Sequence, residues 1–125
     1  MINTVSTDKA PAAVGPYSQA LEVNNLIFCS GQIGINPETG NLADGIEVQI
    51  KQALNNLQAV LEAAGSDIQH VVKTTVYIKN MSDYSVFNQI YGEFFGGHKP
   101  ARATVEVSRL PKDALIEVEA IAVKN

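Results

Sequence analysis

The residues best suited to chemistry lie near the end of the chain, in the stretch PARATVEVSRLPKDALIEVEAIAV. Arg102 stands where a β-strand is expected to begin, and Glu117 and Glu119 interrupt an otherwise apolar strand. Charged side chains between apolar neighbours are costly unless they are paired or used. A guanidinium group can hold a carboxylate through two parallel hydrogen bonds, and a nearby carboxylate can accept a proton or position a water molecule.

Two interpretations of these charges stay open on the spacing alone. In the first, Arg102 and a glutamate neutralise each other at an interface, because structural ion pairs are commoner than catalytic ones. In the second, Arg102 receives the carboxylate of a small ligand while Glu117 handles a proton or a water molecule. The elements that carry these residues must decide how close together they lie.

The pattern of apolar residues predicts one α+β domain that spans residues 1–125. Helices are expected over 44–65, where apolar residues recur every three or four positions, and over 82–97, where aromatic residues do so. The predicted order is β-β-β-α-β-α-β-β, a mixed sheet with two helices packed on one face. Strands are expected at the N-terminus, on each side of Asn24–Asn25, over 70–78, near 103–107 and near 115–123.

The alternation of side chains also predicts a register for the last two strands. An antiparallel hairpin that keeps their apolar residues on the helix-covered face pairs Thr104 with Glu117 and Arg102 with Glu119. All four residues then share the other face, and Arg102 and Glu117 become diagonal neighbours with Cα atoms about 7–8 Å apart. A small polar molecule could lie between them.

Two helices can cover only one face of the predicted sheet. The opposite face remains partly apolar, since Ile121 and Val123 lie there beside the two glutamates. Scattered exposed apolar residues are common, but a face of this kind favours contact with another subunit. We therefore expect an oligomer in which this face is covered.

The composition argues against several classes of protein. The net charge is −4, with nine basic residues scattered among thirteen acidic ones, which is unfavourable for binding nucleic acid. Cys29 is the only cysteine, so the chain can form no internal disulfide and no cysteine-based metal cage. The N-terminus does not resemble a secretory signal, and no apolar run approaches the ~20 residues of a membrane span. We expect a cytoplasmic protein with no metal, nucleic-acid or membrane partner.

Four further residues of reactive or aromatic type are assigned mainly structural roles. His70 and His98 have a spacing that matches no metal or triad motif. Cys29 lies in an apolar strand, where a thiol is usually an inert core residue. Phe87 belongs to the aromatic repeat of the second helix and is expected in the core, although it could also wall a neighbouring pocket.

Three ordered blocks of the sequence resemble a known family. The stretch PARATVEVSRLPKDALIEVEAIAV resembles the C-terminal signature of the RidA (YjgF-type) family of reactive-intermediate deaminases. GPYSQA from Gly15 and FCSGQIG from Phe28 resemble two further blocks of that family, so the similarity spans essentially the whole chain. The resemblance implies a chorismate-mutase-like α+β fold and a homotrimer with sites in the clefts between subunits.

The activity that the resemblance implies is the hydrolysis of 2-imino acids, such as 2-iminobutanoate and 2-iminopropanoate, to 2-oxo acids and ammonia. These imines are tautomers of the enamines that pyridoxal-phosphate-dependent dehydratases release from threonine or serine. A protonated imine is already electrophilic, so the reaction needs orientation, a positioned water and a proton acceptor. No metal or cofactor is required.

The family pattern also implies a role for each site residue. Arg102 holds the substrate carboxylate with help from the backbone N–H of Thr104, and Glu117 positions or activates the water. Many members have cysteine where this chain has Thr104, an exchange that should preserve a contact made by the backbone. The rest of the implied pocket consists of Tyr17 and the backbone around Ser30 and Gly31.

Two other functions remain to be weighed against the deaminase. A small-molecule-sensing regulatory module could use the same arginine cleft without turnover. The family has also been linked to ribonuclease and translation-inhibition activities. A ribonuclease needs an acid–base pair and cationic contacts to phosphate, and this acidic chain offers neither a histidine pair nor a basic groove.

Overall fold

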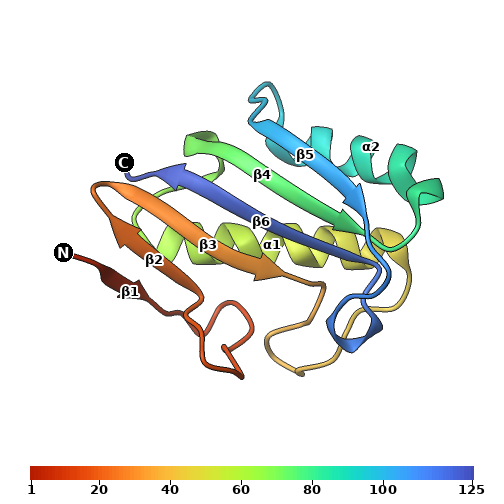
Figure 1. The fold of residues 1–125 in the computed structure, drawn as a ribbon, viewed down its shortest axis with the longest axis horizontal. Coiled ribbons are helices and arrows are strands. Elements are labelled where there is room, and N and C mark those ends of the chain that lie inside the picture. The colour runs from red at the N-terminus through yellow and green to blue at the C-terminus, as the bar shows by residue number, and fades with distance from the viewer.

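The two predicted helices form, and they lie on the same face of the sheet (Figure 1). The computed structural model describes all 125 residues. Helix α1 (Ile46–Ala63) buries most of its apolar stripe, including Ile50, Leu54 and Leu57, because residues three and four apart share one side of a helix. Helix α2 (Tyr84–Phe95) buries Phe87, Tyr91 and Phe95 in the same way.

Six strands form one mixed sheet in the order β1-β2-β3-β6-β4-β5. The element order β-β-β-α-β-α-β-β and the α+β class are as predicted. The turn between the second and third strands has positive φ at both Asn24 (51°) and Asn25 (63°), as a tight hairpin requires. The strands are β1 (Asn3–Val5), β2 (Ala20–Val23), β3 (Leu26–Gln32), β4 (Val71–Ile78), β5 (Ala101–Glu106) and β6 (Ile116–Val123).

The predicted hairpin between the last two strands is wrong. Strand β5 pairs in parallel with β4 at the edge of the sheet, whereas β6 lies inside the sheet between β3 and β4. The physical reason is burial. Strand β6 offers an uninterrupted apolar row to the helices, so it can lie inside the sheet, whereas β5 in that place would bring Arg102 and Thr104 into the core. The crossover from β4 through α2 to β5 is the usual way to connect two parallel neighbours.

The same topology puts Arg102 and Glu117 on opposite faces of the sheet. Arg102 is the register partner of Thr74, which is fully buried on the helix side. Glu117 is the partner of Tyr77, on the open side. The prediction that Arg102 and Glu117 are neighbours on one face is therefore wrong, and two strand spacings of about 5 Å each also separate them.

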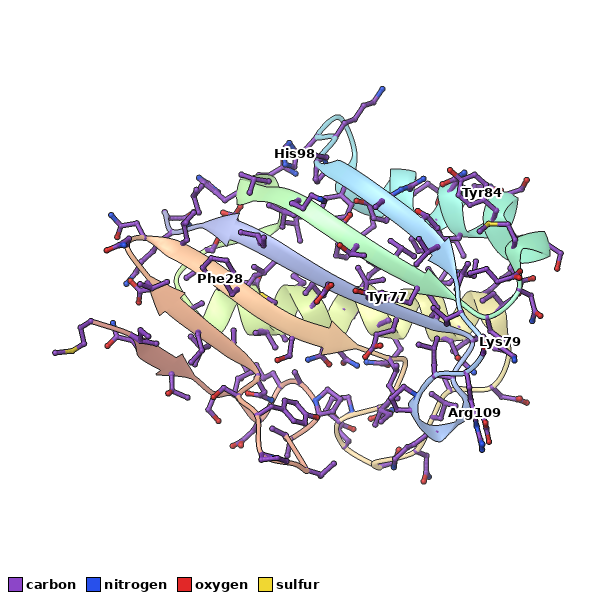
Figure 2. The ribbon with its side chains drawn as sticks, in the orientation of Figure 1. Phe28, Tyr77, Lys79, Tyr84, His98 and Arg109 are labelled. Carbon is purple, nitrogen blue, oxygen red and sulfur yellow. The ribbon has the colours of Figure 1, made fainter.

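The open face of the sheet carries apolar side chains that nothing in the chain covers (Figure 2). Leu21, Phe28 and Ile121 form a row across three adjacent strands. Phe28 is 41 % exposed, and Val105 on the edge strand is 44 % exposed. None of the helices is long and apolar enough to cross a membrane.

Candidate functional site

The predicted site residues fall into two separate groups. Arg102 and Thr104 on β5 lie beside Phe87 of α2, at one edge of the sheet. Tyr17, Gly31 and Glu117 line a cleft of about 370 Å³ at the ends of β3 and β6. Within one chain the two groups do not meet.

The Arg102 guanidinium is held against an aromatic surface of α2. Its Cζ atom lies 4.9 Å from the ring centre of Tyr91, 5.5 Å from that of Phe87 and 5.7 Å from that of Tyr84. Nη2 donates hydrogen bonds to Asn88 Oδ1 at 2.8 Å and to Tyr84 Oη at 3.1 Å. These contacts fix one side of the guanidinium fork by aromatic stacking and hydrogen bonding.

No carboxylate of the chain pairs with Arg102, since its two hydrogen bonds go to an amide and a phenol. The first interpretation, in which Arg102 and a glutamate neutralise each other at an interface, therefore finds no such pair within one chain. The cation borders a pocket of about 250 Å³ that Asn88, Tyr91 and Lys99 also line. Phe87 is fully buried, so its ring contacts the arginine from the side of the core.

Thr104 presents a free backbone donor at the sheet edge. The ladder from β4 to β5 uses the N–H of Val107, which donates to Ile78 O at 2.9 Å. Residues in a parallel ladder point to the neighbouring strand alternately, so the N–H of Thr104 points outward. Its side-chain Oγ1, in contrast, is buried and has no hydrogen-bond partner.

The Glu117 carboxylate lies directly over the backbone of Gly31. A Cβ atom on Gly31 would lie 2.6 Å from Glu117 Oε2 and 2.7 Å from its Cδ, closer than any real contact. Gly31 lies where the register of β3 against β6 shifts, between Cys29 and Gln32. The glycine thus allows a close approach that any larger residue would block.

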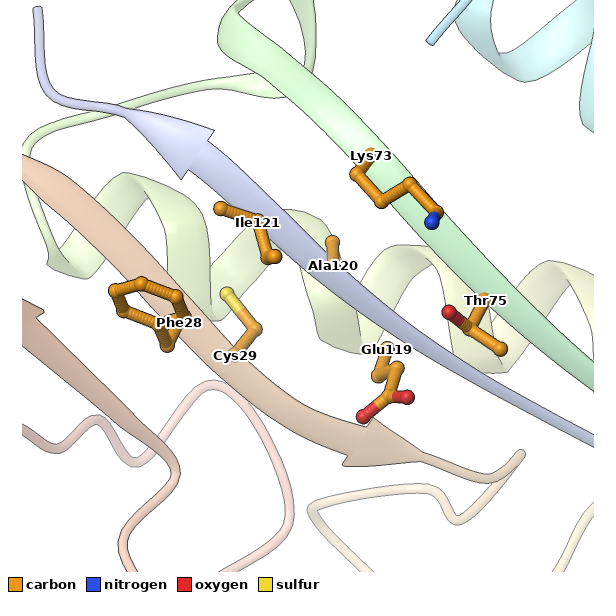
Figure 3. Close-up of a pocket in the computed structure, with 7 residues that line it drawn as sticks. All are labelled: Phe28, Cys29, Lys73, Thr75, Glu119, Ala120 and Ile121. Carbon is orange, nitrogen blue, oxygen red and sulfur yellow. The ribbon is translucent and has the colours of Figure 1, made fainter. Parts of the chain in front are cut away.

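Glu117 and Glu119 lie in different surroundings although both are on the open face. Burial, and after it the charge of Glu119, raises the pKa of Glu117 above its usual range. Glu119 instead accepts a 2.6 Å hydrogen bond from Tyr77 Oη, which raises the pKa of that phenol. Figure 3 shows Glu119 in a separate shallow hollow with Phe28 and Lys73. Glu117 is the better placed of the two to exchange a proton with a ligand.

Tyr17 and Ser30 define the side of the cleft nearest the N-terminus. Tyr17 is 54 % exposed, which leaves its ring accessible. The Ser30 hydroxyl donates a 2.6 Å hydrogen bond to the Ser18 carbonyl, so this side chain fixes the segment next to Tyr17. The backbone N–H of Ser30 also donates within the chain, to the Gln19 carbonyl oxygen at 3.0 Å.

Sequence reasoning missed the residues that hold the arginine. Tyr84 and Tyr91 belong to the aromatic repeat that predicts the second helix, but nothing in that repeat indicates a contact with Arg102, and Asn88 lies outside it. Tyr91 is also a buried core residue. The available signal was their spacing, because Tyr84, Asn88 and Tyr91 lie four and three residues apart and so share one helix side. Nothing in that spacing alone points to Arg102, which lies on a strand.

His70 and Cys29 line neither the pocket beside Arg102 nor the Glu117 cleft, whereas His98 lines the pocket that Arg102 borders. His70 Nδ1 lies 2.7 Å from Asp67 Oδ1, and His98 Nε2 lies 2.6 Å from the Val71 carbonyl oxygen. Cys29 is only 6 % exposed, and burial raises the pKa of its thiol to about 12. The structure contains no cluster of three or more His, Cys, Asp or Glu residues that could hold a metal ion.

Comparison with known proteins agrees with the three sequence blocks. The family described as Endoribonuclease L-PSP matches residues 7–124. A protein named 2-iminobutanoate/2-iminopropanoate deaminase from Escherichia coli K12 is 47 % identical over 128 residues, covering 100 % of both chains. The mouse protein of the same name is 50 % identical over 122 residues, covering 97 % of this chain and 90 % of the mouse protein. The chain belongs to the RidA (YjgF-type) family.

The solved structures agree with this membership. The crystal structure of the Escherichia coli YjgF gene product is 47 % identical to this chain and superposes with a TM-score of 0.94, covering 98 % of this chain and 99 % of that one. The chain therefore has the chorismate-mutase-like fold of the RidA family, as the sequence resemblance implied.

Proposed function

We propose that this RidA-family chain is a hydrolytic deaminase of 2-imino acids, with 2-iminobutanoate and 2-iminopropanoate as substrates and 2-oxo acids and ammonia as products. The deaminases of Escherichia coli and mouse, which match nearly all of this chain, support this substrate class. The two halves of the site support it chemically, since one offers a cation for a carboxylate and the other a carboxylate for a proton.

The observation that carries the proposal is that Arg102 and Glu117 lie on opposite faces of one sheet. Neither half alone can both hold a 2-imino acid and hydrolyse it. The two halves can meet when the open face of one copy covers the β5 edge of the next, which also covers Phe28 and Val105. We therefore propose a homotrimer with each site shared between two subunits, the symmetry being that implied by the family resemblance.

Substrate binding begins at the β5 edge. The face of the Arg102 fork that Tyr84 and Asn88 leave free receives the substrate carboxylate, and the outward N–H of Thr104 donates a further hydrogen bond to it. The carboxylate is then fixed at one end, and the imine carbon lies toward the cleft of the neighbouring copy. Tyr17 and the backbone around Gly31 enclose that carbon.

Glu117 of the neighbouring copy accepts and donates the protons that the hydrolysis requires. It accepts a proton from water as the water oxygen bonds to the imine carbon and the C=N double bond becomes a single bond. The protonated Glu117 then donates its proton to the carbinolamine nitrogen and the C–N bond breaks, so that ammonia leaves. The hydroxyl gives its proton back to Glu117 and becomes the carbonyl of the 2-oxo acid, and the released ammonia finally takes that proton from Glu117. A carboxylate with a raised pKa suits both directions of proton transfer.

We further propose that the reaction removes reactive imines in the cytoplasm, and that neither nucleic acid nor a membrane is a partner. The net charge of −4 and the absence of a basic run support the first exclusion. No feature of the site favours the ribonuclease or sensing alternatives over hydrolysis.

The direct test is the rate of ammonia release from an imine generated in the assay by an amino acid oxidase. The chain should accelerate release from 2-iminobutanoate well above the uncatalysed rate, and a chelator should leave the rate unchanged. A wild-type chain that binds 2-oxobutanoate but does not accelerate hydrolysis would favour the sensing module.

The shared site has a test of its own. Arg102→Ala and Glu117→Gln should each inactivate the trimer, but co-expressed copies should form intact sites wherever Arg102 of one copy meets Glu117 of the next. An equal random mixture should recover about one quarter of the wild-type activity, since each site draws its halves from two neighbours independently. No recovery in mixed trimers of verified composition would show that both residues act from one chain.

A further inference from the structure

Two irregular loops form the walls of the Glu117 cleft. The first, residues 7–19, contributes Pro11, Val14 and Tyr17, and the second, residues 33–43, contributes Ile33 and Ile35. Neither contains a helix or a ladder strand, although an isolated bridge joins Ile35 to Leu42. Loops without a regular ladder are the least constrained part of a fold unless side chains fix their backbone.

A buried amide fixes the first loop. Gln19 is 4 % exposed, and its Oε1 accepts a 2.7 Å hydrogen bond from the N–H of Thr7. Its Nε2 donates to the carbonyl oxygens of Thr7 at 3.1 Å and Pro11 at 2.8 Å, with Ala10 at 3.5 Å. The Gln19 side chain therefore supplies the hydrogen-bond partners for backbone groups of a turn that has no ladder to satisfy them.

A second amide, from α1, fixes the other loop. Asn56 is 1 % exposed and its Nδ2 donates to the carbonyl oxygens of Ile33 at 3.1 Å and Ile35 at 2.8 Å. Its Oδ1 accepts from Gln52 Nε2 at 2.8 Å, so both ends of the amide are satisfied.

A third amide ties the end of that loop to the strand that carries Glu117. Gln49 lies seven residues before Asn56, two helical turns along the same face. Its Nε2 donates to the Ala43 carbonyl at 3.0 Å, and its Oε1 accepts the N–H of Leu115 at 2.8 Å. Gly34 lies so near that an added Cβ would be 2.7 Å from the Gln49 backbone.

We propose that Gln19, Gln49 and Asn56 are positioning residues, which set the shape of the cleft by holding its walls. Gln49 and Asn56 do not line the cleft, and Gln19, which does, has its amide engaged by backbone groups of the loop. A neutral side-chain amide combines two N–H donors with one carbonyl acceptor, which is the set that the contacts of Gln19 and Asn56 use. A carboxylate would set oxygen against oxygen, and an apolar side chain would leave buried carbonyls unpaired. The expected change in KM rests on the proposed function, whereas the expected change in the mobility of the two loops does not.

The kinetic test compares Asn56→Asp with two controls on the same helix. Asn55→Asp makes the same change at the neighbouring exposed residue, and Leu57→Ala destabilises the core without touching an amide. Well below each melting temperature, Asn56→Asp should raise KM for 2-iminobutanoate about tenfold and change kcat far less, because Glu117 stays on its strand. Both controls should keep the wild-type KM, and light scattering should verify the same oligomer in all variants.

Hydrogen exchange tests the same proposal without any activity. Asn56→Asp should speed exchange in residues 33–43, and Gln19→Glu should do so in residues 7–17, while β4 stays as protected as in the wild type. The Gln19 variant also serves if Asn56→Asp does not fold. Wild-type exchange in both walls, or a KM that rises as much in Leu57→Ala, would overturn the positioning role. A wild-type chain without deaminase activity would contradict the proposed function and leave the exchange test standing.

Discussion

The β5–α2 edge and the β3–β6 cleft hold their charged groups by opposite means. At the edge, three aromatic rings and two hydrogen bonds surround Arg102, and no acid neutralises it. In the cleft, Glu117 lies against the bare backbone of Gly31, and its surroundings raise its pKa. The difference fits the two proposed tasks, because a carboxylate clamp must be rigid and always charged, whereas a proton acceptor must remain able to titrate.

The largest effect is expected in the cleft, from Glu117→Gln. The amide keeps the size of the side chain but cannot accept a proton, so turnover should fall by at least about a hundredfold. Pyruvate should still bind in a calorimetric titration, since Arg102 is intact. Glu119→Gln is the matched control, because Glu119 accepts a hydrogen bond from Tyr77 outside the cleft. The Glu119 variant should lower turnover far less. Inactivity of the Glu119 variant together with activity of the Glu117 variant would reverse the assignment.

At the edge, Arg102→Lys should cost at least about tenfold in kcat/KM, or ~1.4 kcal/mol of transition-state stabilisation. Lysine keeps the charge but loses the planar fork that stacks on the rings and binds a carboxylate through two hydrogen bonds. Arg109→Lys is the control, since Arg109 is exposed and pairs only with Asp113. Initial rates equal to the wild type in the Arg102 variant would refute the clamp.

Gly31→Ala should act on the cleft alone. The new Cβ would meet the end of the Glu117 side chain, so the carboxylate must move while the fold can stay. A displacement of that size should lower kcat about fivefold with little change in melting temperature. Gly97→Ala, with open space around it, should change neither quantity. A large drop in melting temperature for Gly31→Ala would mean that the new Cβ displaces the backbone of β3 and not the Glu117 carboxylate.

The sequence predicted the elements of the fold better than the neighbours of its edge strand. Apolar periodicity was enough for both helices and for the order of the elements, since each follows from local spacing. The position of β5 was not predictable in this way, because alternation specifies which residues share a face but not which strand is the neighbour. Assuming that consecutive strands pair gave β5 the wrong neighbour, and assuming that its apolar residues face the helices put Arg102 on the wrong face, since Val105 is exposed on the open side.

The supporting polar residues were hidden for a related reason. Gln49 and Asn56 lie along the buried side of α1, where their spacing matches the apolar stripe, so a search for charged groups passes over them. Their partners are backbone groups of a loop, and the sequence of a loop does not reveal which carbonyls it will bury. The roles of Tyr17, Ser30 and Gly31 came from the family resemblance alone.

The raised pKa of Glu117 predicts a pH dependence of stability. Between its ordinary value of 4.5 and the raised folded-state value, the folded chain binds more protons than the unfolded chain. Stability from this group is therefore present below pH 4.5 and lost as the pH rises through the folded-state pKa. Glu117→Gln lacks this loss, so its unfolding free energy relative to the wild type should be higher at pH 7.5 than at about pH 4. Urea unfolding at fixed protein concentration measures the difference, and a gap that shrinks as the pH rises would contradict the assignment.

The smallest effect is expected from Thr104→Val, which separates the backbone of the edge from its side chain. The Oγ1 of Thr104 is buried without a partner, and such a group costs about 1–3 kcal/mol. Valine has nearly the same shape without the hydroxyl, so the variant should be more stable by about 1 kcal/mol, a rise of a few degrees in melting temperature. The outward N–H is unchanged, so kcat/KM should stay within about twofold of the wild type. Thr104→Ser retains the hydroxyl and should show no gain in stability. A loss of activity in the valine variant with retention in the serine variant would mean that the hydroxyl, and not the backbone N–H, contacts the substrate.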